Sequence, residues 1–183
     1  PLGMINMKLF WEHSIAVGVM AKSIGQYCNI SQPERFYVAG LLHDIGRLVF
    51  YLKLPGLMHD LLLLRETREE SLYTLEIESL GYSHAEVGGR LLENWRVPIS
   101  IHEPVCFHHK PDFSLEFPQV TAAIHVADFW VNRQHFGSSG DRFTLPLYQS
   151  ALKELKLQSY ELDEIWILAE DAMKEVLHQF LNQ

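Results

Sequence analysis

The stretch Gly40-Leu41-Leu42-His43-Asp44-Ile45-Gly46-Arg47 places a histidine and an aspartate side by side among apolar residues. A neutral imidazole and a carboxylate are good ligands for a divalent transition metal. Burying both against aliphatic side chains is costly unless a cation compensates. The stretch therefore predicts that His43 and Asp44 belong to a buried metal centre. The alternative is a pair at the C-terminus of a helix, where the dipole favours the imidazole and the carboxylate is hydrogen-bonded locally.

Length, charge and cysteine content narrow the kinds of protein that this chain can be. The chain has 183 residues, 48% hydrophobic and 21% charged, as expected for one globular domain with a core. Its formal net charge of -8 argues against binding duplex nucleic acid, but a small anionic substrate is compatible with a metal site. Two cysteines without CxxC spacing argue against a disulfide framework. Such cysteine usage fits a reducing cytoplasm, where we expect the protein to lie. The apolar runs are too short to cross a bilayer.

Helical spacing of apolar residues dominates the chain, and no stretch alternates convincingly as a β-strand does. Ser31 is expected to cap the second helix, and Ser83 with Glu86 to form a capping box. The run 137–140, Gly-Ser-Ser-Gly, predicts an exposed loop. The expected helices cover about 8–27, 33–46, 57–68, 72–80, 84–97, 98–109, 120–131, 147–155 and 160–181.

We therefore predict an all-α fold, a compact helical bundle, as a single domain over residues 4–183. Pro1-Leu2-Gly3 is typical of the remnant of a cleaved expression tag.

Ten histidines are many for this length, and several fall where a helix bundle can aim them at one point. Each also has a purely structural interpretation. A buried His13 is satisfied by one hydrogen bond, His84 suits a helix N-terminus, and His108 with His109 suits a surface turn. Asp128 is harder to explain, because its apolar neighbours in Val126-Ala127-Asp128-Phe129-Trp130 leave a carboxylate without an evident partner.

Five segments carry a family resemblance: WEHSIAVGVMA (11–21), AGLLHDIGRLVF (39–50), LGYSHAEVGGRLLENWRVP (80–98), IHEPVCFHH (101–109) and IHVADFW (124–130). In this order they resemble the HD superfamily of metal-dependent phosphohydrolases. They resemble more closely its HDOD branch, the HD-related output domains of bacterial signalling proteins. The resemblance implies an HD-type helical bundle that acts on signalling protein partners.

The resemblance also implies a ligand set. A first ion would take His13, His43, Asp44 and Asp128. A second ion, present in some HD subfamilies, would take His84, His108 and His109, with Asp44 bridging the two. Mixed imidazole and carboxylate ligands suit iron, manganese, zinc or nickel. If the domain is catalytic, Asp44 is its expected catalytic residue. Arg47 stands where many members carry lysine, and would bind a phosphate of the substrate.

Two departures from the family pattern bear on function. HDOD proteins usually carry an N-terminal helical half before the segment at 11–21, and we expect this half to be absent here. Lys110-Pro111-Asp112-Phe113 stands where the branch that cleaves cyclic di-GMP carries a longer acidic and glycine-rich motif. We therefore expect a regulatory module with one or two metal ions. The alternative is an active phosphohydrolase acting on a nucleotide or cyclic nucleotide. His102 and His125 are expected to be structural or to orient ligands.

Overall fold

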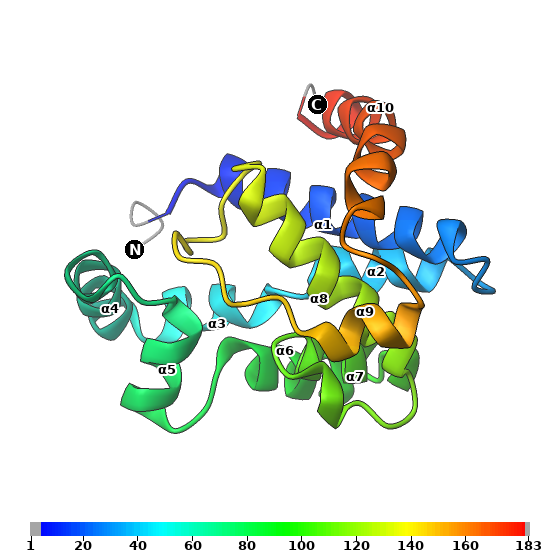
Figure 1. Cartoon of the computed structure of the whole chain (residues 1–183). Coiled ribbons are helices and arrows are strands. Elements are labelled where there is room, and N and C mark those ends of the chain that lie inside the picture. The colour runs from blue at the N-terminus through cyan, green and yellow to red at the C-terminus, as the bar shows by residue number, and fades with distance from the viewer. Residues whose placement is uncertain (1–4, 182–183) are drawn as a thin grey trace.

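The computed structural model describes residues 5–181, and every regular element in this range is helical, as predicted (Figure 1). The expected tag remnant, residues 1–3, lies outside the described range. No helix in the range is long and apolar enough to cross a membrane. In chain order the elements are α1 (Met7–Tyr27), α2 (Glu34–Leu42), α3 (Ile45–Lys53), α4 (Pro55–Arg68), α5 (Leu72–Leu80), α6 (His84–Asn94), α7 (Ile99–Phe107), η2 (Pro111–Phe113), α8 (Pro118–Arg133), α9 (Gln149–Leu155) and α10 (Glu161–Leu181).

Helix α1 packs against α2, α8 and α10, and these helices contribute much of the main hydrophobic core (Figure 1). A second, smaller cluster belongs to α3, α4 and α5, which lie together at one end of the molecule. It contains Phe50, Tyr51, Met58, Leu61, Leu72 and Leu75. The fold thus has two apolar clusters. The predicted ligands on α1 and α8 lie on helices of the main core, and Asp44 precedes α3, a helix of the smaller cluster.

A corner between α2 and α3 replaces the single helix that the sequence predicted through Gly46. Helix α2 ends at Leu42 and α3 begins at Ile45, so His43 and Asp44 form the corner itself. Gly46 packs so closely on the backbone carbonyl of His84 that a Cβ atom at Gly46 would overlap with it. The corner therefore presses the start of α3 against the start of α6.

The helix caps follow the sequence in one case and not in another. Ser83 and Glu86 form the predicted capping box at the start of α6. Ser31 does not cap α2, because the N-cap lies two residues later, at Pro33, and no side chain of the described residues caps the helix there.

The loop at 137–140 is not the exposed segment that its composition predicted. Ser139 is buried, and its carbonyl accepts a hydrogen bond from the Tyr51 hydroxyl at 3.3 Å. The Ser138 N–H donates to the Leu9 carbonyl at 2.9 Å. Gly137 has a φ of 67° and lies against the backbone of His13, where a Cβ atom would not fit. The small residues serve close packing across the bundle instead of mobility.

Candidate metal centre

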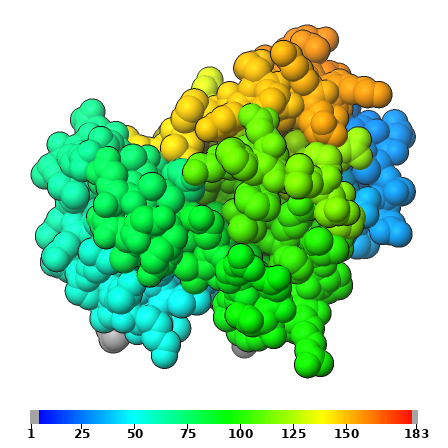
Figure 2. All heavy atoms as spheres, turned by 90° about the horizontal axis from the view of Figure 1, so that it is seen from below, coloured from blue at the N-terminus to red at the C-terminus, as the bar shows by residue number. Residues whose placement is uncertain are grey.

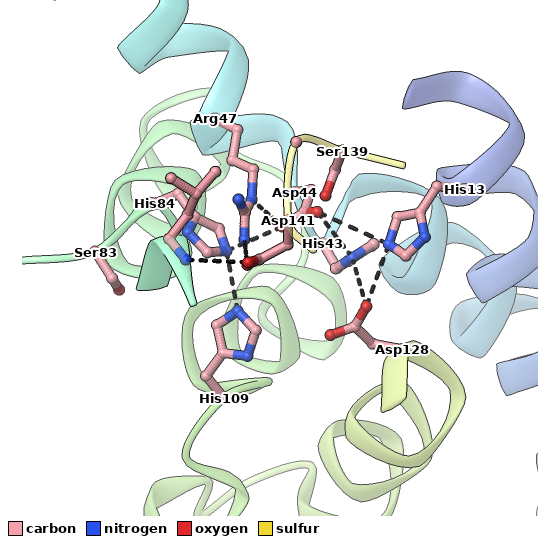
Figure 3. A network of polar contacts seen from close by, with 12 residues as sticks. His13, His43, Asp44, Arg47, Ser83, His84, His109, Asp128, Ser139 and Asp141 are labelled. Atoms are coloured by element: carbon pink, nitrogen blue, oxygen red, sulfur yellow. Dashed lines mark hydrogen bonds and ion pairs between the residues drawn. The ribbon is translucent and has the colours of Figure 1, made fainter. Parts of the chain in front are cut away.

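The structure brings the predicted ligand residues together in one buried cluster (Figure 3). Helix α1, the α2–α3 corner, the start of α6, the end of α7 and helix α8 each supply at least one of them. They form two groups in which the donor atoms lie within 4.8 Å of one another. The first group is His13, His43 and Asp128; the second is Asp44, His84, His108 and His109.

Asp44 lies between the two groups. Its Oδ2 atom is 3.3 Å from His43 Nε2 and 3.9 Å from His13 Nε2. Its Oδ1 atom is 2.9 Å from His84 Nε2 and 4.0 Å from His108 Nε2. Each carboxylate oxygen thus faces a different group, which is the placement that a bridging ligand of two ions requires.

Asp128 closes the first group from the side of α8. Its Oδ1 atom is 3.2 Å from His13 Nε2 and 3.7 Å from His43 Nε2. The same oxygen accepts a hydrogen bond from the Asn132 amide at 2.7 Å, which fixes the carboxylate one turn along the helix. In the second group, His109 Nε2 lies 3.1 Å from His84 Nε2.

Three imidazole rings are oriented in the same way. His43 Nδ1 donates to the Gly40 carbonyl and His108 Nδ1 donates to the Val105 carbonyl, both at 2.7 Å. His84 Nδ1 donates to Glu76 Oε2 at 2.6 Å. The outer nitrogen of each ring is therefore protonated, and Nε2 points into the cluster. An outer hydrogen bond of this kind fixes the tautomer and raises the basicity of metal-binding histidines.

Several of the inward atoms have no hydrogen-bond partner among residues 5–181. This holds for Nε2 of His13, His43 and His108, all of which are fully buried. Nitrogen lone pairs that face carboxylate oxygens repel each other unless a cation or a proton lies between them. These atoms therefore fit a divalent transition metal, because imidazole nitrogen and carboxylate oxygen are ligands that such an ion prefers.

The charges around the cluster shift its pKa values in opposite directions. Burial lowers the pKa of His43, but the Asp44 and Asp128 carboxylates outweigh it and raise that pKa to about 10. Burial, together with the charge on His43 and His84, lowers the pKa of His108 to about 3. Burial raises the pKa of Asp44, yet Arg47 and the surrounding histidines hold it well below its usual range. The carboxylates thus stay ionised. In the metal-free protein, protons on histidine side chains balance their negative charge.

Arg47, predicted to bind a substrate phosphate, is buried and faces two carboxylates. Its Nε atom lies 3.1 Å from Asp44 Oδ1, and its Nη2 atom lies 2.8 Å from Asp141 Oδ2. The guanidinium therefore balances the charge of Asp44, the residue predicted to bridge two ions, in this structure. Within the described part of the chain, its Nη1 atom has no hydrogen-bond partner.

The sequence did not identify three other residues around the cluster. Glu76 is fully buried on α5 and accepts hydrogen bonds from both the backbone N–H and the ring of His84. Asp141 pairs with Arg47 across the bundle, and the Tyr73 ring lies 4.5 Å from the ring of His109. Only Glu76 had a signal in the sequence, because it is a carboxylate between the apolar residues Leu75 and Ile77. The contacts of Asp141 and Tyr73 depend on the tertiary fold.

The two remaining histidines near the cluster in sequence differ in their surroundings. His125 is buried and links the carbonyl of His108 to the backbone N–H of Tyr148, at 2.8 and 3.1 Å. It can therefore orient the end of α7. His102 is half-buried and lines a separate pocket of about 340 Å³ between α6 and α7.

Comparisons with known proteins identify the family and the fold. A family model described as the HDOD domain matches residues 1–111, which include every predicted ligand except Asp128. An uncharacterized protein of Treponema pallidum (strain Nichols) is 25% identical over 129 residues, 68% of this chain and 25% of that protein. The chain thus spans about a quarter of this curated relative's length.

Two solved structures share the fold. An HDOD domain protein from Geobacter sulfurreducens is 19% identical, with a TM-score of 0.82 over 94% of this chain and 62% of that chain. A response regulator from Methylococcus capsulatus is 22% identical, with a TM-score of 0.58 over 88% of this chain and 61% of that chain. At these identities the likeness concerns the fold alone. The family match over more than half of the chain shows that this protein belongs to the HDOD domain family.

Proposed function

We propose that the chain is a signal-transduction output domain of a bacterial cytoplasm, built around a metal centre and acting on signalling protein partners. The observation that carries the metal centre is the convergence on Asp44 of imidazole nitrogens that have no hydrogen-bond partner among residues 5–181. Nε2 of His13 and of His43 face Asp44 Oδ2, and Nε2 of His108 faces Oδ1. Family membership and the fold shared with a response regulator support the signalling role.

In this proposal one or two ions of iron, manganese, zinc or nickel occupy the cluster. His13, His43, Asp44 and Asp128 would hold the first, and Asp44, His84, His108 and His109 the second. The bound ions would supply positive charge that holds α1, α6, α7 and α8 to the α2–α3 corner. A role in holding helices together suits the deep burial of the ligands, of which the histidines are at most 7% exposed.

A phosphohydrolase of nucleotides or cyclic nucleotides is the second candidate. It is favoured by the bridging position of Asp44 and by a pocket that reaches His109. Bound ions would supply Lewis acidity toward phosphate oxygens. Asp44 would act as their shared ligand, and Arg47 would balance its charge or, after rearrangement, bind a phosphate.

Metal analysis tests the proposal. We expect between about one and two transition-metal ions per chain in protein purified without added metal, and anomalous scattering where His43, Asp44 and Asp128 converge. Chelation should lower the melting temperature, because the ligands lose their compensating charge. Metal-free protein whose melting temperature does not change on adding iron, manganese, zinc or nickel would overturn the metal centre.

Turnover separates the two functions. Wild-type protein and Asp44→Asn are incubated with bis-p-nitrophenyl phosphate and with cyclic dinucleotides, with the exposed His59→Ala variant as control. Hydrolysis that Asp44→Asn abolishes and His59→Ala retains would support the phosphohydrolase. Full metal occupancy without hydrolysis would support the regulatory module.

A further inference from the structure

The segment 137–142 crosses the bundle without regular secondary structure. In Figure 1 the loop that contains it, drawn in yellow, leaves α8, passes toward the end formed by α3, α4 and α5, and returns to α9. Gly137 packs on the backbone of His13, a predicted ligand of the first group. Near the other end of the segment, Asp141 reaches Arg47 beside the cluster (Figure 3). We call residues 137–142 the strap, because they contact the surroundings of the candidate centre at two separate places.

Backbone contacts of the strap are few. Among residues 5–181, a single hydrogen bond between backbone groups joins it to another element, from the Ser138 N–H to the Leu9 carbonyl at 2.9 Å. Its other anchors include side-chain contacts with α3 and α4: Tyr51 donates to the Ser139 carbonyl, Arg65 to the Gly140 carbonyl, Arg47 to Asp141, and Arg142 to Glu66. A segment attached in this way can detach locally while the helices stay folded.

Arg47 connects the strap with the predicted bridging ligand. The buried guanidinium lies 3.1 Å from Asp44 Oδ1 through Nε and 2.8 Å from Asp141 Oδ2 through Nη2. Ions held by Asp44 would add positive charge beside this guanidinium, and like charges repel most strongly where water is excluded. The Asp141 carboxylate offsets that repulsion as long as the strap stays closed. Ion binding and strap closure therefore favour each other.

The strap also fixes the start of α5. Asp141 Oδ1 accepts a hydrogen bond from the Leu72 N–H at 3.0 Å. Leu72 is the first residue of α5, so its N–H has no acceptor within the helix. The same helix carries Glu76, which accepts hydrogen bonds from the backbone and the ring of His84. Opening of the strap would therefore release one end of the helix that orients a predicted ligand.

We propose that residues 137–142 form a metal-responsive strap, which closes over the centre when ions are bound and detaches when they leave. This inference rests on the proposed metal centre. The movement would carry the state of buried ions to the molecular surface, where the Arg142 side chain is 67% exposed. In Figure 2 the yellow atoms of this part of the chain reach the surface beside the teal atoms of α4. A signalling partner then meets a different surface on the loaded and on the empty domain.

Hydrogen–deuterium exchange of the 183-residue chain, with zinc bound and after chelation, tests the strap. The reporters are the backbone N–H groups of Ser138, Gly140 and Leu72, because each is hydrogen-bonded through a residue of the strap. We expect all of them to exchange at least about fivefold more slowly with zinc bound, which is the lower end of typical coupling between two sites. In Asp141→Asn, zinc should slow the Ser138 and Gly140 N–H groups no more than it slows exchange in the rest of the protein. The exposed Asp60→Asn variant should behave as wild type.

Arg65→Met tests the coupling from outside the centre. Arg65 holds the Gly140 carbonyl, and its other contacts are with Glu66. Its loss should speed exchange at Ser138 and weaken zinc binding severalfold in competition with a chelating indicator, because zinc then has to close a looser strap. Arg68→Met on the same helix is the matched control, since Arg68 pairs with carboxylates outside the strap. Unchanged zinc affinity in a variant whose strap exchanges faster overturns the inference.

The zinc content of each sample distinguishes this inference from the metal centre on which it rests. Protein that takes up no zinc, iron, manganese or nickel overturns the metal centre and the strap together. Protein that holds zinc while the reporter N–H groups exchange at unchanged rates overturns the strap alone. Melting curves confirm that each variant is folded, so that faster exchange is assigned to the strap and not to loss of the whole structure.

Discussion

Arg47 and Asp141, 94 residues apart in sequence, are joined by a contact of 2.8 Å between Nη2 and Oδ2 (Figure 3). The other oxygen of Asp141 accepts a hydrogen bond from the backbone N–H of Leu72 at 3.0 Å. Arg47 in turn contacts Asp44 Oδ1 at 3.1 Å. Through Arg47, one loop carboxylate thereby connects the start of α5 and helix α3 with Asp44, the predicted bridging ligand.

Asp141→Asn should destabilise the protein by about 1–3 kcal/mol, because the buried guanidinium loses one of its two counter-charges while Asp44 remains. Urea unfolding of the metal-loaded protein measures the change. Asp60→Asn is the control, since the Asp60 side chain is 80% exposed. Equal unfolding midpoints for both variants would contradict the role assigned to Asp141.

Single ligand substitutions should remove the two ions separately. His13→Ala is expected to empty the first group and to retain the ion of the second, and His109→Ala to do the reverse. Asp44→Asn should lower the occupancy of both ions, because each oxygen of Asp44 faces one of the two groups. Metal counts per chain after gel filtration measure this, with His59→Ala as control. Two ions retained in Asp44→Asn would contradict the bridging assignment.

Glu76→Gln should weaken metal binding about 10- to 100-fold, as loss of an outer partner of a ligating histidine does. The amide keeps the size of the side chain but removes the charge that makes His84 basic. Competition with a chelating indicator gives the affinity. Glu78→Gln on the same helix is the control, because Glu78 is exposed and pairs with Arg68. A similar loss in both variants would point to helix α5 in general.

Metal affinity should rise with pH. In metal-free protein, burial lowers the pKa of His43, but Asp44 and Asp128 raise it to about 10, above its ordinary 6.5. His43 therefore carries a second proton at neutral pH, and a metal must displace it. Titrations at pH 6, 7 and 8 should show steadily tighter binding, with proton release visible in buffers of different ionisation enthalpy. Affinity independent of pH would show that no such proton is displaced.

Much of the fold followed from the sequence, because amphipathic spacing and the Ser83 capping box are local signals. The candidate ligand residues came from the family resemblance, through motifs in a fixed order. The structure places them together, and their role as ligands stays a prediction. The corner at His43–Asp44 was missed because apolar residues continue through it. The burial of Ser139 was missed because its partners, such as Tyr51, are distant in sequence. From composition alone, the Gly-Ser-Ser-Gly run at 137–140 is predicted to be an exposed, flexible loop.

His43 and Asp44 are neighbours in the chain, yet His43 belongs to the first group and Asp44 faces both. Under the proposed metal centre, an ion in one group therefore restrains a residue that is one peptide bond away from a ligand of the other. Binding of one ion then changes the affinity for the other, and the cooperativity can be positive or negative. By thermodynamic reciprocity, each ion alters the affinity for the other by the same factor.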